Sequence, residues 1–389
     1  MNEQKVLAAI ADVLPAVRDS AARVDRSARI EPRLIGRLAE AGLFRLLQPR
    51  AFGGLAADPA DHLEAVHRIA GECGSTGWLA SVLGVHSWHL GLFPEKAQRE
   101  VWGPDPSALI SSSYAPSGRA TPVGGGYRLT GHWSFSSGCE HARWCLTGAL
   151  ATDPTGGPPR MMACLLPRAD YRIVPNWDTV GLRGTGSHDI VVEDVFVPEH
   201  RTLGTGPSTP EVPPGLAVNR EPVYRMPFPS MLTTAVAAPV VGIAAGVYAE
   251  HLAGLRERLA DGSARAADRE PERHLRLARA IGEVDAARTS LTGNIAELYG
   301  YASRALPPPM ALRARTRRDQ VLAVERAVGA VDDLLAGAGG SALRTSSANP
   351  QRAWRDVHTG AGHAANEVRR GLLPSVQESL GLPVSEAMV

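Results

Sequence analysis

A histidine and a carboxylate stand four residues apart near the end of the chain, at His363 and Glu367. If this segment is helical, the two side chains share one face, so the carboxylate can orient the imidazole ring and raise its basicity. The unperturbed pKa of histidine, about 6.5, suits a general base that works near neutral pH. The pair therefore predicts acid–base chemistry, and the alternative is a His/Glu pair on a solvated helix.

Two further histidines, His86 and His89, lie in an otherwise apolar run that includes Trp78, Trp88 and Leu90. The run is helix-like, and a histidine inside it either faces a ligand or satisfies a backbone carbonyl in the core. Both interpretations stay open for His86, whereas we expect His89 to be structural.

Several other kinds of chemistry are excluded by what the sequence lacks. It has 41 basic and 40 acidic residues, a net charge of +1, which gives no electrostatic case for binding nucleic acid or an anionic membrane. No Gly-x-Gly-x-x-Gly run follows a strand, which argues against a nicotinamide-nucleotide fold. The cysteines form neither a Cys-x-x-Cys pair nor a zinc-like His/Cys cluster, so we expect no metal, no disulfide framework and a reducing cytoplasm. They are Cys73, Cys139, Cys145 and Cys164.

The 389 residues divide into units that differ in predicted secondary structure, and these units must position the residues named above. Residues 1–107 have helical patterns, and residues 108–206 change to short β-like runs separated by Gly and Pro. Residues 207–228 form a loop or linker. The Pro-, Ser-, Thr- and Gly-rich stretch Thr205–Pro214, which overlaps the start of this region, is predicted to be a boundary or an active-site loop. Residues 229–389 return to long helical patterns that predict a bundle.

Three breaks, near Asp261–Glu270, Pro307–Pro309 and Thr345–Pro350, divide the last unit into four predicted helices. The first helix contains Met231–Tyr248, the only run that could cross a membrane. It is rich in Ala and includes Thr233, Thr234 and Pro239, so we expect a buried helix and no membrane. The N-terminus combines acidic residues with a helical apolar rhythm, unlike a signal peptide, so we expect a cytoplasmic protein.

Two stretches of the β-like unit resemble the flavin-contacting barrel of the acyl-CoA dehydrogenase superfamily. The first is Tyr127-Arg-Leu-Thr-Gly-His-Trp-Ser-Phe-Ser-Ser-Gly-Cys-Glu-His141, and the second runs from Val180-Gly-Leu-Arg-Gly-Thr-Gly-Ser187 to Asp194-Val-Phe-Val-Pro198. Either stretch alone could be a β-hairpin with a polar turn. The resemblance covers the whole chain and implies an α+β fold with an N-terminal helical domain, a middle β-barrel and a C-terminal four-helix bundle.

The same resemblance assigns flavin-binding roles. In the superfamily an aromatic ring lies beside the isoalloxazine and a hydroxyl against its N5, and these are Phe135 and Ser137 here. Arg183 contacts the flavin or only braces the barrel. The Gly339 and Gly340 pair resembles an element near the phosphate or adenine part of the flavin, unless it only caps a helix. The remaining residues of the flavin wall are serines, Ser112 and Ser136.

The region of the Arg355-Asp356 pair distinguishes the branches of this superfamily. In an acyl-CoA dehydrogenase a catalytic Glu follows such a pair, but the expected position falls near Ala364, beside His363. The chain instead resembles the flavin-dependent monooxygenases of the same fold, the oxygenase components of two-component phenol hydroxylases. The likeness is greatest to those that act on secosteroids and weaker to p-hydroxyphenylacetate hydroxylase. The matching runs are Cys73–Trp78, Gly84–Leu90, Ile110–Pro116, Ser136–Cys139, Val180–Gly186 and Trp354–Asp356.

The resemblance implies a reduced-flavin-dependent monooxygenase that hydroxylates a polycyclic phenol, either a secosteroid or an aromatic polyketide, through a C4a-hydroperoxyflavin. The cofactors are O₂ and reduced FMN or FAD, supplied by a separate flavin reductase, and the chain forms a homotetramer. The expected catalytic residues are His363, His86 and Ser137. The expected substrate contacts are His86, Trp88, Tyr114 and Glu367.

Two alternatives stay open. An acyl-CoA dehydrogenase-like oxidoreductase is opposed by the missing Glu, and a flavin-binding protein without activity does not need His363 and Ser137 together. The substrate is also open, because the chain departs from the secosteroid pattern after Asn366, where Glu367 replaces an Asp. N-hydroxylation and epoxidation are further possibilities for a reduced-flavin oxygenase.

Overall fold

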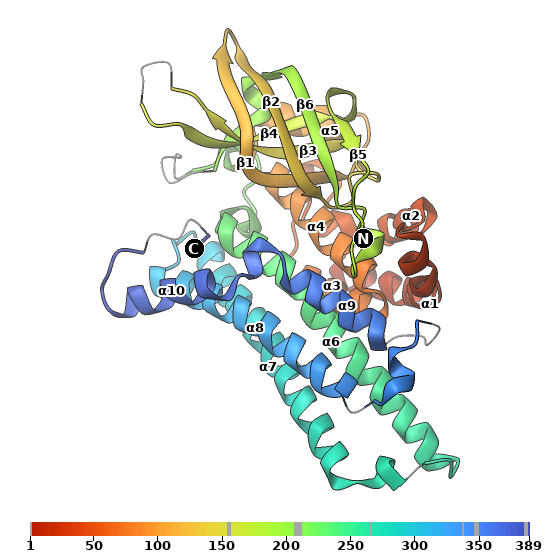
Figure 1. Ribbon diagram of the computed structural model, residues 1–389. Helices are drawn as coiled ribbons and strands as arrows, with labels where there is room; N and C mark the ends of the chain where they lie inside the picture. The colour runs from red at the N-terminus through yellow and green to blue at the C-terminus, as the bar shows by residue number, and fades with distance from the viewer. Residues whose placement is uncertain are drawn as a thin grey trace.

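The computed structural model describes residues 2–153, 157–205, 212–264, 266–336, 338–345, 350–384 and 388–389. Helices from both ends of the chain pack together, and a β-sheet lies across one end of them, at the top of Figure 1. The predicted α+β order of helical, β and helical segments is confirmed.

Local capping signals set the ends of the N-terminal helices. Asn2 Oδ1 accepts the N–H of Lys5 at 3.0 Å, and Asp58 Oδ1 accepts the N–H of Ala60 at 2.9 Å, so each begins a helix. Pro32 occupies the first turn of another. The helices are α1 (Glu3–Ser27), α2 (Pro32–Glu40), α3 (Pro59–Glu72), α4 (Gly74–Leu90) and α5 (Glu95–Trp102).

A single seven-stranded sheet follows, with strand order β5-β6-β2-β1-β3-β4-β7. β1 and β3 are parallel, and the other neighbouring pairs are antiparallel. The sheet curls around a core of its own, in which Trp133, Cys145 and Cys164 are fully buried, and so forms the barrel-like unit. β5 and β7 were not predicted, because three residues are too few for an alternating pattern. The strands are β1 (Ile110–Val123), β2 (Gly126–Ser136), β3 (Trp144–Ala151), β4 (Arg160–Pro167), β5 (Arg172–Val174), β6 (His188–Pro198) and β7 (Thr202–Gly204).

The C-terminal segment contains three long helices followed by two short ones. The predicted breaks near Asp261–Glu270 and Pro307–Pro309 are confirmed, whereas residues 346–349 of the third lie outside the described residues. The described stretch after it is divided once more, into two short helices, so this segment has five described helices where the breaks predicted four. A short 3-10 turn, η10 (Ala364–Asn366), separates the last two helices. The helices are α6 (Phe228–Ala260), α7 (Pro271–Ser303), α8 (Met310–Ala336), α9 (Pro350–Ala361) and α10 (Val368–Ser379).

α6 is the core helix of the molecule. By length and composition it could cross a membrane, but 83% of its most apolar window is buried inside the protein. It packs against α3, α4 and α8. Gly246 permits the close approach to α3, since a Cβ there would lie 2.1 Å from the carbonyl oxygen of Gly71. The prediction of a buried helix is therefore confirmed.

The described part of the segment between the sheet and α6 contains short turns. Of the predicted boundary or active-site loop, Thr205–Pro214, residues 206–211 lie outside the described residues. The described part of the predicted loop or linker, residues 212–228, contains two 3-10 turns, η6 (Pro214–Ala217) and η7 (Pro222–Arg225). Asn219 Nδ2 donates to the carbonyl of Gly91 at 2.7 Å and fixes this segment to the end of α4.

Candidate active site

Helix α4 is the element that both groups of candidate residues contact. All 17 of its residues are buried, because it is apolar on every side and packs against α3, α6 and β1. Trp78 lies near its start and His86 lies about 12 Å further along, at ~1.5 Å per residue. One group of polar side chains contacts α4 at Trp78, and a second group contacts it at His86.

His86 and Ser112 form a hydrogen-bonded pair with a fixed direction. His86 Nδ1 lies 2.8 Å from the carbonyl oxygen of Ile110, which can only accept, so Nδ1 carries the proton. Nε2 is then an acceptor, and Ser112 Oγ donates to it over 2.8 Å. Burial lowers the pKa of His86 to about 4, so its ring is neutral at pH 7. The pair can therefore take up a proton at Nε2 through Ser112.

A cluster of rings, named the aromatic wall, lies next to this pair and contains Tyr114, His89 and Phe228. The Tyr114 hydroxyl lies 2.7 Å from His89 Nδ1. The Phe228 ring lies 4.5 Å from the His89 ring and 5.6 Å from the Tyr114 ring, measured between centroids. Burial lowers the pKa of His89 to about 3, so this ring is also neutral. Phe228 was not among the predicted site residues, because in the sequence it is an ordinary aromatic residue at a helix start.

A β-bulge in β2 separates Phe135 from Ser136. The pairing of β2 with β6 changes register between Trp133 and Ser136, and Phe135 has a left-handed φ of +68°. As a result Ser136 is fully buried, 3.8 Å from Cys145 Sγ, whereas Phe135 is 67% exposed with its ring edge against Trp177. Bulges and strained residues of this kind are common at ligand sites, where they aim a side chain outward.

Ser137 ends a row of hydroxyl groups. Its Oγ lies 2.8 Å from Ser187 Oγ, which lies 2.7 Å from Thr185 Oγ1, and Thr185 donates to the carbonyl of Leu182 at 2.9 Å. Trp78 Nε1 donates to Ser137 Oγ at 3.1 Å. Ser187 and Thr185 are buried and Ser137 is half-buried. The sequence did not single out Ser187 and Thr185, although both lie in the run that resembles the flavin barrel.

His363 and Glu367 do not form the expected pair. The segment between them is not α-helical, and each residue caps a different turn. His363 Nδ1 accepts the N–H of Ala365 at 3.1 Å, whereas the Glu367 carboxylate accepts the N–H groups of Arg369 and Arg370 at 3.0 and 2.9 Å. The prediction that Glu367 orients the His363 ring is wrong, because the start of α10 takes both carboxylate oxygens.

The His363 ring shares a neighbour with Ser137, since its centroid lies 5.7 Å from that of Trp78. His363 is an exposed residue, but desolvation of its ring by the surrounding protein lowers its pKa to about 4. Because Nδ1 accepts the capping bond, the proton lies on Nε2, and the neutral ring is a hydrogen-bond donor. The lowered pKa argues against a base that works near neutral pH, and the catalytic role of His363 itself stays a prediction.

Two other expected contacts take structural roles. Trp88 is fully buried and donates from Nε1 to the carbonyl of Val223 at 2.7 Å, so it is a core residue rather than a substrate contact. Arg183 donates to the carbonyls of Asp25 and Thr179, both at 2.9 Å. Two roles were expected for Arg183, contact with the flavin and bracing of the barrel. These bonds support the second, because they join the barrel to α1.

The glycine pair Gly339 and Gly340 lies on the surface beyond the end of α8, in open space. Gly339 has a φ of +75°, a conformation that favours glycine. The pair lies apart from the side chains around α4, so a role toward the flavin remains a prediction.

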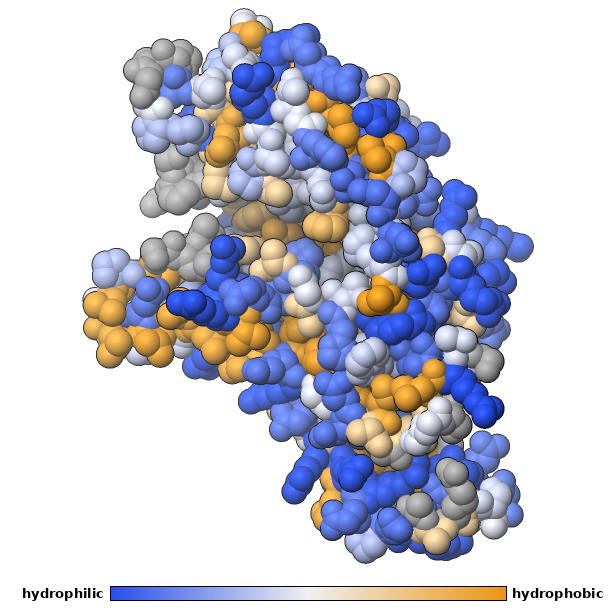
Figure 2. All heavy atoms as spheres, in the orientation of Figure 1, coloured by the Kyte–Doolittle hydropathy of each residue, from blue (hydrophilic) through white to orange (hydrophobic). Residues whose placement is uncertain are grey.

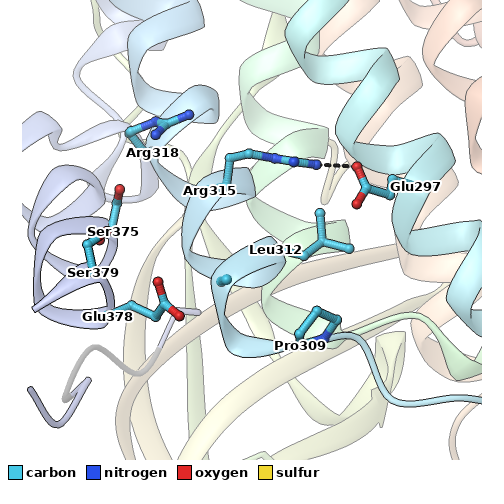
Figure 3. A pocket seen from close by; sticks show the side chains of 9 residues that line it. Glu297, Pro309, Leu312, Arg315, Arg318, Ser375, Glu378 and Ser379 are labelled. Carbon is cyan, nitrogen blue, oxygen red and sulfur yellow. Dashed lines mark hydrogen bonds and ion pairs between the residues drawn. The ribbon is translucent and has the colours of Figure 1, made fainter. Parts of the chain in front are cut away.

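A hollow between α7, α8 and α10 is separate from this site (Figure 3). Its lining includes Arg315 and Arg318 together with Glu297 and Glu378, and Arg315 forms an ion pair with Glu297. No candidate residue lines it. Paired surface charges of this kind need no ligand to explain them.

Family models match both helical segments of the chain. The acyl-CoA dehydrogenase N-terminal domain matches residues 3–107, and the acyl-CoA dehydrogenase C-terminal domain matches residues 234–368. Together these matches cover more than half of the chain. The chain belongs to the acyl-CoA dehydrogenase family.

Relatives identify the branch of this family as flavin-dependent monooxygenases. The oxygenase subunit HsaA of Mycobacterium tuberculosis, a flavin-dependent monooxygenase, is 45% identical over 390 residues, covering 100% of this chain and 98% of the relative. The oxygenase component of an FADH2-dependent resorcinol hydroxylase from a Rhizobium species is 36% identical, covering 92% and 90%. The crystal structure of 3-HSA hydroxylase from Rhodococcus sp. RHA1 matches with a TM-score of 0.94 at 42% identity, covering 99% of both chains.

The resemblance drawn from the sequence is thereby confirmed. The chain is an oxygenase component that depends on reduced flavin, and neither an acyl-CoA dehydrogenase nor an inactive flavin-binding protein. The absence of a Glu at Ala364 agrees with this branch.

Proposed function

We propose that this chain hydroxylates the ring of a polycyclic phenol beside its hydroxyl group, with reduced FMN or FAD delivered transiently by a separate reductase. The directed Ser112–His86 pair in a wall of aromatic rings carries the proposal. It offers one hydrogen-bonding place for one hydroxyl group on an otherwise apolar ligand. The names of the relatives, a 3-HSA hydroxylase and a resorcinol hydroxylase, support a phenolic substrate.

The chain has residues that fit a flavin. Phe135 offers an exposed ring held in a strained conformation, and Ser137 offers an acceptor oxygen for the N5–H group. Gly339 and Gly340, exposed and unobstructed, suit the phosphate or adenine part, which a neighbouring copy can share. When bound, reduced flavin supplies the electrons that activate O₂ for insertion into the ring.

At the substrate, the protein handles one proton. The phenol donates to Ser112 Oγ, and as its proton transfers there, the proton of Ser112 moves to His86 Nε2, while the Ile110 carbonyl holds Nδ1–H. With a pKa of about 4, His86 holds this proton only while the phenolate lies beside it, because a nearby negative charge raises the pKa of an imidazole. The phenolate is richer in electrons than the phenol, so hydroxylation is faster, and the proton then returns to the product.

His363 and Trp78 act beside the flavin. We assign His363 the role of a donor from Nε2–H, held in place by its bond to Ala365, and not that of a base. Trp78 closes the gap between His363 and Ser137 and so helps to exclude water.

The assembly we propose is a homotetramer in the cytoplasm. Figure 2 shows apolar side chains gathered over α10, where Leu373, Val376 and Leu380 follow helical spacing and are 46%, 58% and 68% exposed. An exposed apolar helix face of this kind is suited to a second copy of the chain. The four cysteines are free and buried, which suits a reducing compartment.

The decisive test supplies chemically reduced flavin, O₂ and a polycyclic phenol to the purified chain without a reductase. We expect hydroxylated product, and no steady oxidation of NADH by the chain alone. Ser137→Ala should consume reduced flavin and O₂ but release more hydrogen peroxide and less product, because the bond to N5 is lost while the cavity remains. A chain that binds reduced flavin yet yields only hydrogen peroxide with every phenol would overturn the proposal.

A further inference from the structure

The row of hydroxyl groups behind Ser137 has only one consistent direction. It contains three hydroxyl protons and three oxygen–oxygen contacts: Ser137 to Ser187, Ser187 to Thr185, and Thr185 to the carbonyl of Leu182. The carbonyl has no proton to give, so the last contact needs the proton of Thr185. Thr185 then accepts from Ser187, and Ser187 accepts from Ser137. Any other arrangement leaves two lone pairs facing each other within 3 Å in a buried place.

This direction fixes what Ser137 can offer to a ligand. Its own proton is used on Ser187, and the indole N–H of Trp78, which can only donate, takes one of its two lone pairs. One lone pair remains. Ser137 is therefore an acceptor and cannot donate to a ligand while the row is intact.

We infer that Thr185 and Ser187 are positioning residues that make the flavin site select the reduced form. The inference rests on the proposed function, in which Ser137 faces the flavin N5. Reduced flavin carries a proton on N5 and donates, whereas oxidised flavin has a lone pair there and accepts. An acceptor-only Ser137 bonds the first and repels the second.

The location of the two residues suits this role. Thr185 is 1% exposed and Ser187 is 4% exposed, so water does not compete for their hydrogen bonds, and neither is the group that faces the ligand. The row ends on the carbonyl of Leu182, whose N–H is in turn bound by Asp356 at 2.5 Å. The carbonyl acceptor is thus held in place from the C-terminal helices.

Two substitutions should change the preference by different amounts. Ser187→Ala frees the proton of Ser137, which can then donate to oxidised flavin. Thr185→Val has a larger effect, because Ser187 loses its acceptor and donates its proton to Ser137 instead. Both lone pairs of Ser137 are then occupied, by Ser187 and Trp78. The proton of Ser137 must therefore point toward the ligand. We expect the ratio of dissociation constants, oxidised over reduced, to fall by roughly fivefold for Ser187→Ala and roughly 30-fold for Thr185→Val, for one and two hydrogen bonds respectively.

The matched control is Thr185→Ser, which keeps the hydroxyl and should leave the ratio within roughly twofold of the wild-type value. Each ratio is measured on the full chain by fluorescence titration with oxidised flavin and by anaerobic ultrafiltration with dithionite-reduced flavin, so a partly folded variant affects both constants equally. If Thr185 and Ser187 only stabilise the fold, their substitution weakens the binding of oxidised and reduced flavin by the same factor, and the ratio stays constant.

Equal ratios for Thr185→Val and Thr185→Ser would overturn the inference, as would a wild-type chain that hydroxylates phenols but binds oxidised flavin at least as tightly as reduced flavin. In both cases the proposed function survives. A wild-type chain that binds neither form would overturn the proposed function, and the inference with it.

Discussion

Asp356 Oδ1 accepts the backbone N–H of Leu182 at 2.5 Å, and this contact joins α9 to the barrel loop. Leu182 has a left-handed φ of +49°, so the loop needs such an anchor. Gly74 leaves room for the carboxylate, since a Cβ there would lie 2.6 Å from Asp356 Oδ2. Through Leu182, a buried acid in the C-terminal helices sets the end of the hydroxyl row that reaches Ser137.

The charge on Asp356 should make stability depend on pH. Burial raises its pKa from 3.8 to about 6, although Arg352 and Arg355 favour the charged form and Asp25 opposes it. The folded chain therefore binds more protons than the unfolded chain, so this group's contribution to stability is complete below pH 3.8 and is lost as the pH rises through 6. The full shift corresponds to about 3 kcal/mol.

Asp356→Asn keeps an acceptor for Leu182 but removes the titration. We expect the free energy of unfolding of the variant, minus that of the wild type, to rise by up to about 3 kcal/mol between pH 4 and pH 7. Urea denaturation at several pH values measures the difference, in which the other titrating groups cancel. A difference that stays constant over this range would contradict the assignment.

His363 has two separable roles, a cap and a donor, and two substitutions divide them. His363→Ala should lower stability by about 1 kcal/mol through loss of the cap to Ala365, and should also lower the product yield. His363→Asn can still cap, so stability should stay near that of the wild type while the product yield falls, because the Nε2–H donor is lost.

The pH dependence of this loss identifies the chemistry of His363. Since its pKa is lowered to about 4, the ring is neutral from pH 6 to pH 9 and the loss in His363→Asn should be the same throughout. Product yield measured with excess reduced flavin checks this. Recovery of the variant at high pH, where the phenol ionises unaided, would instead make His363 the general base.

The sequence predicted the parts of the fold whose apolar patterns are long. α6 falls in this class. Ser137 was singled out by a motif with its own spacing, and its role toward the flavin stays a prediction. The spacing of His363 and Glu367 was misleading, because side chains four residues apart share a helix face only if the backbone between them is helical. Here each of them bonds to the backbone N–H groups of a new turn, and that competition is not visible in residue spacing.

The hydroxyl row could not be predicted from the sequence for a different reason. Ser137 and Ser187 are 50 positions apart, and only the packing of the loop at Leu182 against the end of β2 brings them within 2.8 Å. The same holds for His86 and Ser112, 26 positions apart on a helix and a strand. Hydrogen bonds between distant segments depend on the tertiary structure, which no local pattern encodes.

His86 and Ser112 should act as one unit in catalysis. We expect His86→Ala and Ser112→Ala each to lower kcat/KM by about 10²-fold, and the double substitution to cost little more than the worse single one, because both act on one proton path. Initial rates with excess reduced flavin give the three values. Fully multiplicative effects would show that the two residues act independently, and the proposed proton transfer would then be wrong.

The face of α10 should hold copies of the chain together. Val376→Glu combined with Leu380→Glu places two like charges on this face and should shift the chain from a tetramer to smaller species at micromolar concentration. Val123→Glu is the control, since Val123 is an exposed apolar residue of β1, outside α10. Sedimentation velocity measures both variants, and a wild-type chain that sediments only as a monomer would refute the proposed assembly.

The last prediction concerns the size and charge of the substrate. The rings clustered beside the Ser112–His86 pair are those of Tyr114, His89 and Phe228, and none of these three carries a positive charge at pH 7. A substrate carboxylate would find no partner among them. A second fused ring that buries roughly 100 Å² of apolar surface gains about 2.5 kcal/mol at ~25 cal/mol per Å², before ordering costs.

Three substrates separate these two effects: a fused two-ring phenol, p-cresol and p-hydroxyphenylacetate. We expect kcat/KM to fall in that order, with the two-ring phenol roughly tenfold or more above p-cresol for its extra surface. p-Hydroxyphenylacetate should be lowest, because its carboxylate must lose water without a cation to replace it. The assay uses excess reduced flavin, so the reductase does not limit the rate. If kcat/KM is higher for p-hydroxyphenylacetate than for p-cresol, the site holds a cation for the carboxylate and the polycyclic assignment fails. Equal kcat/KM values for p-cresol and the two-ring phenol would show that the aromatic rings of the site enclose a single ring of the substrate.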